Sequence, residues 1–210
     1  MKELGFVHRF VPATRRNTPT LLLLHGTGGD ERDLIPLGET LLPGAALLSP
    51  RGKVLENGMP RFFRRLAEGV FDLPDLRHRT RELSDFIAGA RHEYQIAGQI
   101  LAVGYSNGAN IAASLMLLYP GVLSGAVLFR AMIPFVPDAL PQLKGTKILL
   151  LAGLRDAIVP RDQPARLADI FERAGATVSL QWDDGGHELS PNDFAVANRW
   201  LNHLNEKDTP

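Results

Sequence analysis

The sequence of 210 residues contains no cysteine. Disulfide bonds, thiolate metal ligands and a cysteine nucleophile are therefore all excluded. An excess of charge of either sign is also missing, because 23 Lys and Arg residues balance 23 Asp and Glu residues. Proteins that bind nucleic acid generally need surplus positive charge to neutralise phosphates. The balance argues against a nucleic-acid partner and gives no support for binding at a membrane surface.

We also expect neither a secretory signal nor a membrane-spanning segment in this sequence. The first ten residues, MKELGFVHRF, scatter charges where a signal peptide needs an unbroken apolar stretch. The segment 100–119 has no charged residue and is long enough to cross a bilayer, but glycine, serine and asparagine interrupt its centre. A buried strand, a tight turn and a packed helix explain this segment better. We therefore expect a cytoplasmic protein without a membrane span.

Short apolar runs alternate along the chain with longer amphipathic stretches. This alternation is typical of an α/β protein with a mostly parallel central sheet and helices on both faces. Continuous apolar runs indicate strands that are buried on both sides. Strands are expected at 21–24, 45–48, 100–103, 126–129, 148–151 and 178–182. Helices are expected at 80–94, 107–118, 163–174 and 193–204.

The length fits a single α/β domain over residues 1–210, and we find no linker, internal repeat or low-complexity tract. Residues 50–74 have no clear period and contain several glycines and prolines. We expect them to form a long loop over the sheet, and loops of that length are usually functional. The polar tail at 206–210 should fray. The sequence leaves open whether the chain forms a homodimer.

Residues 104–108 read Gly-Tyr-Ser-Asn-Gly and match the G-x-S-x-G pattern around Ser106. The pattern is weak by itself, but here an expected strand ends directly before it and an expected helix begins directly after it. In such a turn the serine takes a strained conformation that lifts its hydroxyl above the sheet. Side chains at the two glycine positions would collide across the sharp crossing. We therefore predict that Ser106 is a nucleophile.

A serine hydroxyl needs a base to remove its proton, so a histidine must lie nearby. His187 follows an expected strand in the glycine-rich stretch Asp-Gly-Gly-His-Glu, from which it could reach over the sheet edge. His25 also ends a strand but is the weaker candidate. Surface positions are expected for the other histidines, at 8, 78, 92 and 203.

The acid that orients the histidine should come between serine and histidine along the chain, after the strand at 148–151. Asp156 occupies that place, in Gly-Leu-Arg-Asp-Ala-Ile-Val-Pro. Asp162 lies one short loop further on and is the alternative. The sequence thus predicts a catalytic triad of Ser106, Asp156 and His187.

The loop at 26–31, Gly-Thr-Gly-Gly-Asp-Glu, follows the first buried strand. Acyl transfer builds up an oxyanion, which backbone N–H groups must already face. We assign the N–H groups of Thr27 and Asn107 to this oxyanion hole. A phosphate cradle is the alternative, but Glu31 stands where a dinucleotide fingerprint needs its third glycine, and no Walker lysine follows. The absence of an H-E-x-x-H pattern argues against a metal.

With these residues, the sequence resembles the phospholipase/carboxylesterase family of α/β hydrolases, which includes small bacterial carboxylesterases and acyl-protein thioesterases. The matching stretches are 21–33, 104–108, Asp156 before Val-Pro, and Gly-His-Glu at 186–188. Together they extend from about residue 20 to about residue 200, nearly the whole domain. The resemblance implies an α/β-hydrolase fold without a large cap domain. It also implies hydrolysis of a small-molecule ester or thioester without a cofactor or metal.

The sequence departs from this family in two places. Asn107 follows the nucleophile where family members often have glutamine. This difference matters little for the oxyanion hole, because the donor there is the backbone N–H and not the side chain. The stretch after the fourth expected strand reads Phe-Arg-Ala-Met at 129–132, where family members tend to have small polar residues. The second departure concerns the substrate rather than the mechanism.

The substrate is expected to be an ester of a small to medium acyl group. A thioesterase or lysophospholipase-type activity is the alternative, and a non-catalytic ligand-binding protein is the least favoured. Arg130, at the end of a strand, has two interpretations: an ion pair with a nearby carboxylate such as Glu188, or recognition of an anionic substrate group. A modest apolar groove is expected to be lined by Met59, Phe62, Phe63 and Met132.

Overall fold

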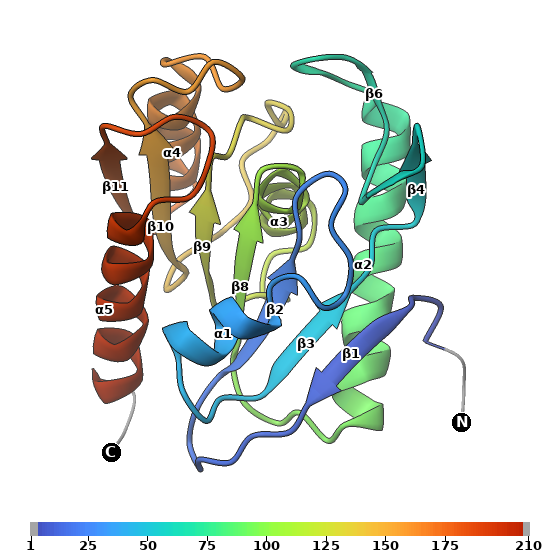
Figure 1. Ribbon diagram of the computed structural model, residues 1–210, viewed down its shortest axis with the longest axis vertical. Coiled ribbons are helices and arrows are strands. Elements are labelled where there is room, and N and C mark those ends of the chain that lie inside the picture. The colour runs from blue at the N-terminus through green and yellow to red at the C-terminus, as the bar shows by residue number, and fades with distance from the viewer. Residues whose placement is uncertain (1–3, 208–210) are drawn as a thin grey trace.

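The structure, a computed structural model, describes residues 4–207 and is built around a seven-stranded sheet (Figure 1). The sheet order is β1-β3-β2-β8-β9-β10-β11. The edge strand β1 pairs with β3 in antiparallel orientation, and all the other pairs are parallel. The strands are β1 His8–Val11, β2 Thr20–Leu24, β3 Leu47–Pro50, β8 Ile100–Tyr105, β9 Gly125–Phe129, β10 Lys147–Gly153 and β11 Thr177–Asp183.

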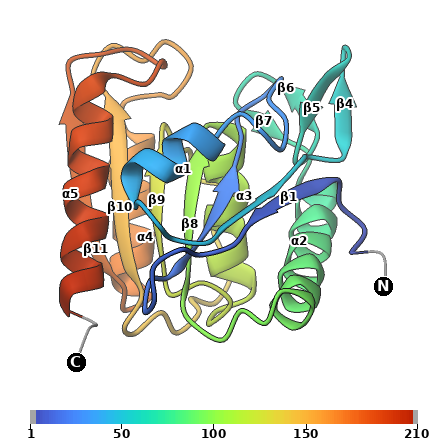
Figure 2. The same ribbon diagram turned by 60° about the horizontal axis from the view of Figure 1, so that its bottom comes forward.

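Helices cover both faces of this sheet, as the two views show (Figures 1 and 2). One face carries α1 (Ile35–Leu41) and α5 (Pro191–Lys207). The other face carries α2 (Leu73–Glu93), α3 (Asn107–Leu118) and α4 (Gln163–Arg173). The predicted mostly parallel sheet with helices on both faces and no large cap is confirmed.

Strand β2 explains why the buried strands read as continuous apolar runs. Leu21 and Leu23 pack in the core on the α1 and α5 side. Leu22 and Leu24 pack in the core on the side of α2, α3 and α4. Because successive side chains of a strand point to opposite faces, a strand between two helical layers must be apolar at every position.

The structure differs from the expected elements in β1, in α1 and in the start of α2. β1 and α1 were not predicted, whereas the edge strand β11 agrees with the expected strand at 178–182 to within one residue at each end. Helix α2 begins at Leu73 rather than at Thr80, because the Asp72 side chain caps it by accepting a hydrogen bond from the Asp75 N–H at 3.1 Å. A cap adds a polar first turn that hydrophobic periodicity does not reveal.

Residues 50–74 are not the open loop that we expected. They contain two hairpins, β4–β5 (Val54–Glu56 and Met59–Arg61) and β6–β7 (Arg65–Ala67 and Val70–Phe71). Asn57 and Gly58 form the first turn with φ of 51° and 80°, as a tight hairpin requires. These strands are too short to show a period of two. Both hairpins lie above the carboxyl ends of the strands, next to the start of α2 (Figure 2).

The segment 100–119 forms β8, a sharp turn and α3, as predicted. Within residues 4–207, no helix has the length and apolar character needed to cross a membrane. Helix α5 extends to Lys207. Residues 208–210 of the tail that we expect to fray lie outside the described residues.

Candidate active site

Ser106 lies in the turn between β8 and α3, with φ of 52° and ψ of −112°. A non-glycine residue rarely adopts this conformation, which costs about 1–3 kcal/mol. A Cβ atom at Gly104 would lie 2.8 Å from the Ala109 Cα, and one at Gly108 would lie 2.0 Å from the Leu24 carbonyl oxygen. The crossing of strand and helix therefore requires both glycines of the pattern.

The structure brings Ser106, His187 and Asp156 together at the carboxyl edge of the sheet. The Ser106 Oγ lies 2.9 Å from the His187 Nε2, and the His187 Nδ1 lies 2.8 Å from the Asp156 Oδ2. His187 follows β11 and Asp156 follows β10, so parallel strand ends supply both. The contacts fit an imidazole that donates through Nδ1 and accepts the serine proton at Nε2.

Asp156 is fixed by its own backbone surroundings. Its Oδ1 accepts hydrogen bonds from the Ile158 N–H at 2.8 Å and the Val159 N–H at 2.9 Å. Its side chain is almost fully buried. The alternative acid, Asp162, lies at the N-terminus of α4 and pairs with Arg166 at 2.9 Å, with more than half of its side chain exposed. Of the two candidates, only Asp156 contacts the histidine.

His25 is buried and holds the loop that follows β2. Its Nδ1 donates to the Gly26 carbonyl oxygen at 2.6 Å, and its Nε2 accepts from the Gly52 N–H at 2.9 Å. Since Nε2 is an acceptor here, the ring is neutral, and burial lowers its pKa from the ordinary value of 6.5. His25 thus braces the loop and does not reach Ser106.

The buried neutral ring of His25 predicts a pH dependence of stability. The unfolded chain binds a proton at this histidine below about pH 6.5, whereas the folded chain does so only at a lower pH. The contribution of the neutral His25 ring to the free energy of unfolding is therefore fully present above about pH 6.5, and it is lost as the pH falls towards the pKa of His25 in the folded chain. We expect the free energy of unfolding, measured in urea, to decrease between pH 6.5 and 5. The decrease should be smaller in His25→Asn, and an identical slope in both proteins would contradict the assignment.

Strand β5 braces the predicted oxyanion hole, which the sequence did not indicate. The Gly28 N–H donates to the Pro60 carbonyl oxygen at 2.9 Å, and the Arg61 Nη1 donates to the Thr27 Oγ1 at 2.8 Å. On the elbow side, the Phe62 N–H donates to the Asn107 Oδ1 at 2.7 Å. The asparagine after the nucleophile therefore has a side-chain role in positioning this segment.

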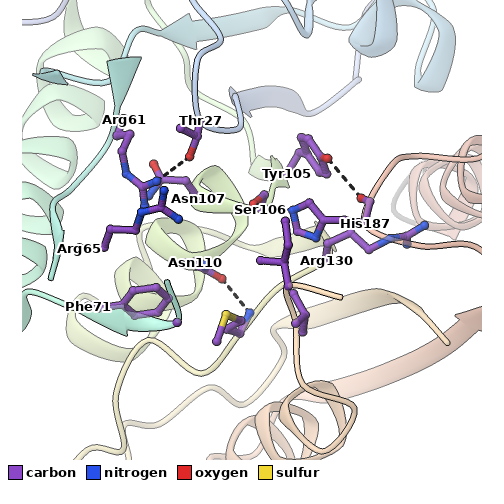
Figure 3. Close-up of a pocket in the computed structure, with 14 residues that line it drawn as sticks. Thr27, Arg61, Arg65, Phe71, Tyr105, Ser106, Asn107, Asn110, Arg130 and His187 are labelled. Carbon is purple, nitrogen blue, oxygen red and sulfur yellow. Dashed lines mark hydrogen bonds between the residues drawn. The ribbon is translucent and has the colours of Figure 1, made fainter. Parts of the chain in front are cut away.

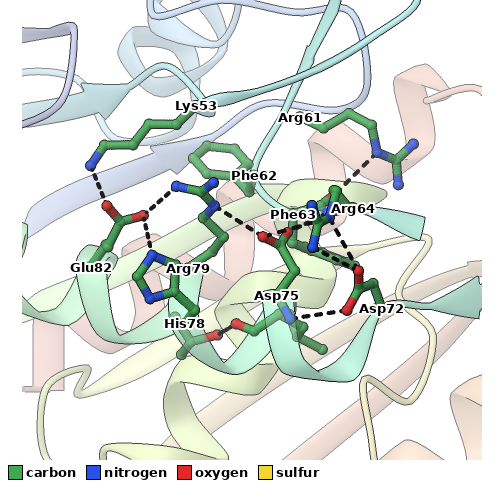
Figure 4. Close-up of polar contacts among 12 residues, drawn as sticks. Lys53, Arg61, Phe62, Phe63, Arg64, Asp72, Asp75, His78, Arg79 and Glu82 are labelled. Atoms are coloured by element: carbon green, nitrogen blue, oxygen red, sulfur yellow. Dashed lines mark hydrogen bonds and ion pairs between the residues drawn. The ribbon is translucent and has the colours of Figure 1, made fainter. Parts of the chain in front are cut away.

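The segment that follows β5 is in turn tied to α2 by polar contacts (Figure 4). The Asp75 Oδ2 accepts from the Arg64 N–H at 2.7 Å, and Asp75 is itself buried. Glu82 of α2 pairs with Lys53, the residue before β4, and with Arg79 of the same helix, each at 2.8 Å. Helix α2 therefore supports the chain that carries Arg61 towards the active site.

Several residues that we expected to line an apolar groove lie elsewhere. Phe62 and Phe63 are 1% and 0% exposed and belong to the core, because the chain leaving β5 turns inward there. Met59 is 41% exposed and lies over Gly28 instead. Only Met132 of this group lines the cavity next to Ser106. The prediction was wrong for the other three, since apolar character does not distinguish a pocket wall from a core.

The cavity next to Ser106 has a volume of about 280 Å³ (Figure 3). Thr27, Asn107 and Asn110 contribute polar groups to its wall. Its apolar wall consists of Phe71, Met132, Ile158 and Val159. None of the described lining residues is acidic, and no group of three or more His, Asp or Glu side chains within residues 4–207 is arranged to hold a metal ion.

Two arginines that the sequence analysis did not single out, Arg61 and Arg65, also line this cavity. Both pair with Glu56, at 3.0 Å and 2.9 Å respectively. The hydrogen bond from Arg65 holds the pKa of Glu56 below its ordinary value. Two guanidinium groups thus share one carboxylate, which leaves a net positive charge on this wall.

Arg130 is among the residues that line the cavity, but its guanidinium extends away from Ser106 (Figure 3) and its side chain is fully buried, with φ of 55° at its backbone. Its guanidinium pairs with Asp193 through two contacts, at 2.6 and 3.0 Å, not with the Glu188 carboxylate. The guanidinium also donates hydrogen bonds to the carbonyl oxygens of Gly186, Glu188 and Leu151. Every N–H donor is thereby engaged. Recognition of substrate by Arg130 is excluded, and the arginine instead holds the carbonyls on either side of His187.

Removal of one partner of this buried pair should strongly destabilise the fold. Arg130→Met leaves the buried carboxylate of Asp193 without its counter-charge, so we expect the free energy of unfolding to fall by about 3–5 kcal/mol. Asp193→Asn should cost a similar amount. The double variant should lose less than the sum of both, because no charge is left unpaired. Denaturant unfolding measures all three, and strict additivity would contradict the coupling.

This chain is similar to known proteins over most of its length. The model of the phospholipase/carboxylesterase family matches residues 8–205. The chain is 50% identical over 181 residues to a putative hydrolase, MhqD, of Bacillus subtilis, covering 86% of this chain and 90% of that protein. The crystal structure of a Bacillus cereus carboxylesterase superimposes with a TM-score of 0.93 at 46% identity, covering 95% and 94% of the two chains.

A further solved structure, that of YahD with malic acid, superimposes with a TM-score of 0.89 at 29% identity, covering 94% and 98% of the two chains. The family match, the identity and the superposition all extend over most of the chain, and they agree with the sheet order and the sharp turn at Ser106. This chain therefore belongs to the phospholipase/carboxylesterase family and has the α/β-hydrolase fold.

Proposed function

We propose that this protein hydrolyses carboxylic esters of small to medium acyl groups through a covalent acyl-serine intermediate. The observation that carries the proposal is the chain of hydrogen bonds from Asp156 through His187 to Ser106, which ends at the cavity. A carboxylate, an imidazole and a hydroxyl in this order form the arrangement that activates a serine nucleophile.

In the acylation step, the His187 Nε2 takes the hydroxyl proton as the Ser106 Oγ forms a bond to the ester carbonyl carbon. The carbonyl oxygen gains a negative charge in the tetrahedral intermediate. The bond to the leaving-group oxygen then breaks, and His187 returns its proton to that oxygen, which releases an alcohol. Asp156 holds the imidazole in the required tautomer and stabilises its positive form.

Water repeats the sequence in the deacylation step. The His187 Nε2 takes a proton from water, whose oxygen attacks the acyl carbon, and the bond to the Ser106 Oγ breaks. The serine oxygen recovers the proton from His187, and a carboxylic acid is released. The serine proton that leaves with the alcohol is thus replaced by a proton from water, and the complete cycle restores the original protonation of the enzyme.

The oxyanion is assigned to the N–H groups of Thr27 and Asn107, which lie on the cavity wall beside Ser106. Asn107 is the first residue of α3, so its N–H has no carbonyl partner within the helix. Within the described part of the chain, the Thr27 N–H donates to no backbone carbonyl. Both donors are therefore available, and β5 braces them before substrate arrives.

The size of the cavity supports small substrates. Its volume of about 280 Å³ lies just below the range of ligand pockets, which is roughly 300–1,000 Å³. A cavity of this volume, with two arginines on its wall, does not favour the long acyl chain of a lysophospholipid. Thioesters would react by the same steps. The neighbour solved with malic acid suggests small carboxylic acids and their esters as further probes.

The proposal is tested by the turnover of p-nitrophenyl esters of graded acyl length and of matched thioesters. We expect hydrolysis that is fastest for short acyl groups and that depends on Ser106. An organophosphorus probe should label the same residue, as detected by mass spectrometry of the digested protein. Absence of turnover on the whole panel, or a label on another residue, would sink the proposal.

A further inference from the structure

The two arginines on the cavity wall differ in how far their donors are used. The Arg61 Nε donates to the Phe63 carbonyl oxygen, and its Nη1 contacts Thr27 and Glu56, so most of this buried guanidinium is committed. Arg65 uses only its Nε, on Glu56. Among the described residues, neither of its two Nη groups has a hydrogen-bond partner, and 31% of the side chain is exposed.

The positive charge of Arg61 and Arg65 is also only partly compensated. Glu56 faces both arginines, and no described residue lining the cavity is acidic. Arg130 shows the contrast, because its charge is fully matched by Asp193. A guanidinium with a free edge, held in place through its Nε and set beside the apolar ring of Phe71, is well suited to receive a carboxylate through paired hydrogen bonds.

The position of the arginines indicates which part of an ester they would contact. The leaving-group oxygen must lie within reach of the His187 Nε2, which protonates it. Arg61 and Arg65 lie on the other side of Ser106 from His187, next to Thr27 (Figure 3). The acyl part of the substrate, which points away from the leaving group, therefore extends towards them.

We propose that Arg65, supported by Arg61 and Glu56, binds a carboxylate on the acyl part of the substrate. The preferred substrates are then monoesters of short dicarboxylic acids, with the free carboxylate on Arg65 and the ester carbonyl at Ser106. This proposal rests on the proposed ester hydrolysis and names the substrate class for it.

The test compares the initial hydrolysis rates of monomethyl glutarate and dimethyl glutarate, which differ in charge and little in shape. Arg65→Met should lower kcat/KM for the monomethyl ester by about 10- to 100-fold, because a hydrogen-bonded ion pair is lost. Most of the change should be in KM, since Arg65 binds a part of the substrate remote from the reacting bond. For the dimethyl ester, kcat/KM should stay within about twofold. Arg65→Lys should retain part of the preference.

Arg64→Met is the matched control. Arg64 is the neighbouring residue on the chain, but it pairs with Asp72 at 3.0 Å and does not line the cavity (Figure 4). This variant removes the same charge from the same segment, and it should leave both esters unaffected. Equal losses on both esters in Arg65→Met, or equal losses in the two arginine variants, would overturn the proposal.

A third ester and a binding measurement test the two remaining alternatives. If Arg65→Met affects O-acetylglycolate, which carries its carboxylate on the alcohol part, and spares monomethyl glutarate, the assignment to the acyl part is wrong. If the wild-type protein hydrolyses no ester, the proposed function fails, and calorimetric binding of glutarate to wild type and Arg65→Met then decides on the carboxylate site alone. Binding that is equal in both proteins, or absent from both, would overturn it.

Discussion

Replacement of Ser106 by alanine is expected to lower kcat for ester hydrolysis by roughly three to six orders of magnitude. In the proposed mechanism the Oγ atom bonds to the acyl carbon, and no other hydroxyl contacts the His187 Nε2 in the described structure. Alanine keeps the Cβ and the same backbone, so the strained turn and the fold should be retained. Steady-state kinetics on a p-nitrophenyl ester and far-UV circular dichroism measure the two effects.

His187→Ala should produce a loss of similar size, and the double variant should be hardly worse than either single variant, because the two residues act as a unit. A variant of either residue that kept more than about a tenth of the wild-type kcat would show that the triad is assigned wrongly.

Asp156→Asn is expected to lower kcat by about 10⁴-fold. The Ile158 and Val159 N–H groups both donate to the Asp156 Oδ1, so in the variant they select the amide oxygen for that place. The amide NH₂ then faces the His187 Nδ1, which must become the acceptor, and the proton moves to Nε2. In that tautomer the ring cannot accept the Ser106 proton.

Asp162→Asn is the control for this variant, since it removes the same charge from the aspartate nearest along the sequence. Asp162 is 57% exposed and pairs with Arg166, so kcat should stay within about twofold of wild type. The kinetics of both variants on one neutral ester decide the matter. If Asp162→Asn lost most of its kcat while Asp156→Asn stayed active, Asp162 and not Asp156 would be the acid that orients His187.

Local patterns in the sequence were sufficient for the layered fold and for the turn at Ser106. Apolar residues at every position of a strand indicate that both of its faces are buried, as they are in an inner strand of such a sheet. The glycines at 104 and 108 report a close approach of backbone to backbone, which the structure shows. The edge strand β1 was not predicted, because one exposed side relaxes the requirement for apolar residues. The other edge strand, β11, agrees with the expected strand at 178–182 to within one residue at each end.

The surroundings of the candidate site were decided only by the tertiary structure. Arg61 and Thr27 are 34 residues apart, and Arg130 and Asp193 are 63 apart, so no local pattern could have paired them. Phe62 and Arg61 are adjacent in the chain, yet one lies in the core and the other on the cavity wall.

The sequence by itself therefore determined the class of fold and the order of serine, acid and histidine, because burial and turn conformation are properties of neighbouring residues. The tertiary structure decided which arginine keeps unpaired donors on the cavity wall and which arginine is fully paired inside the protein. The physical reason is that the availability of a charge depends on the partners that distant segments bring to it, and these are fixed only when the whole chain packs.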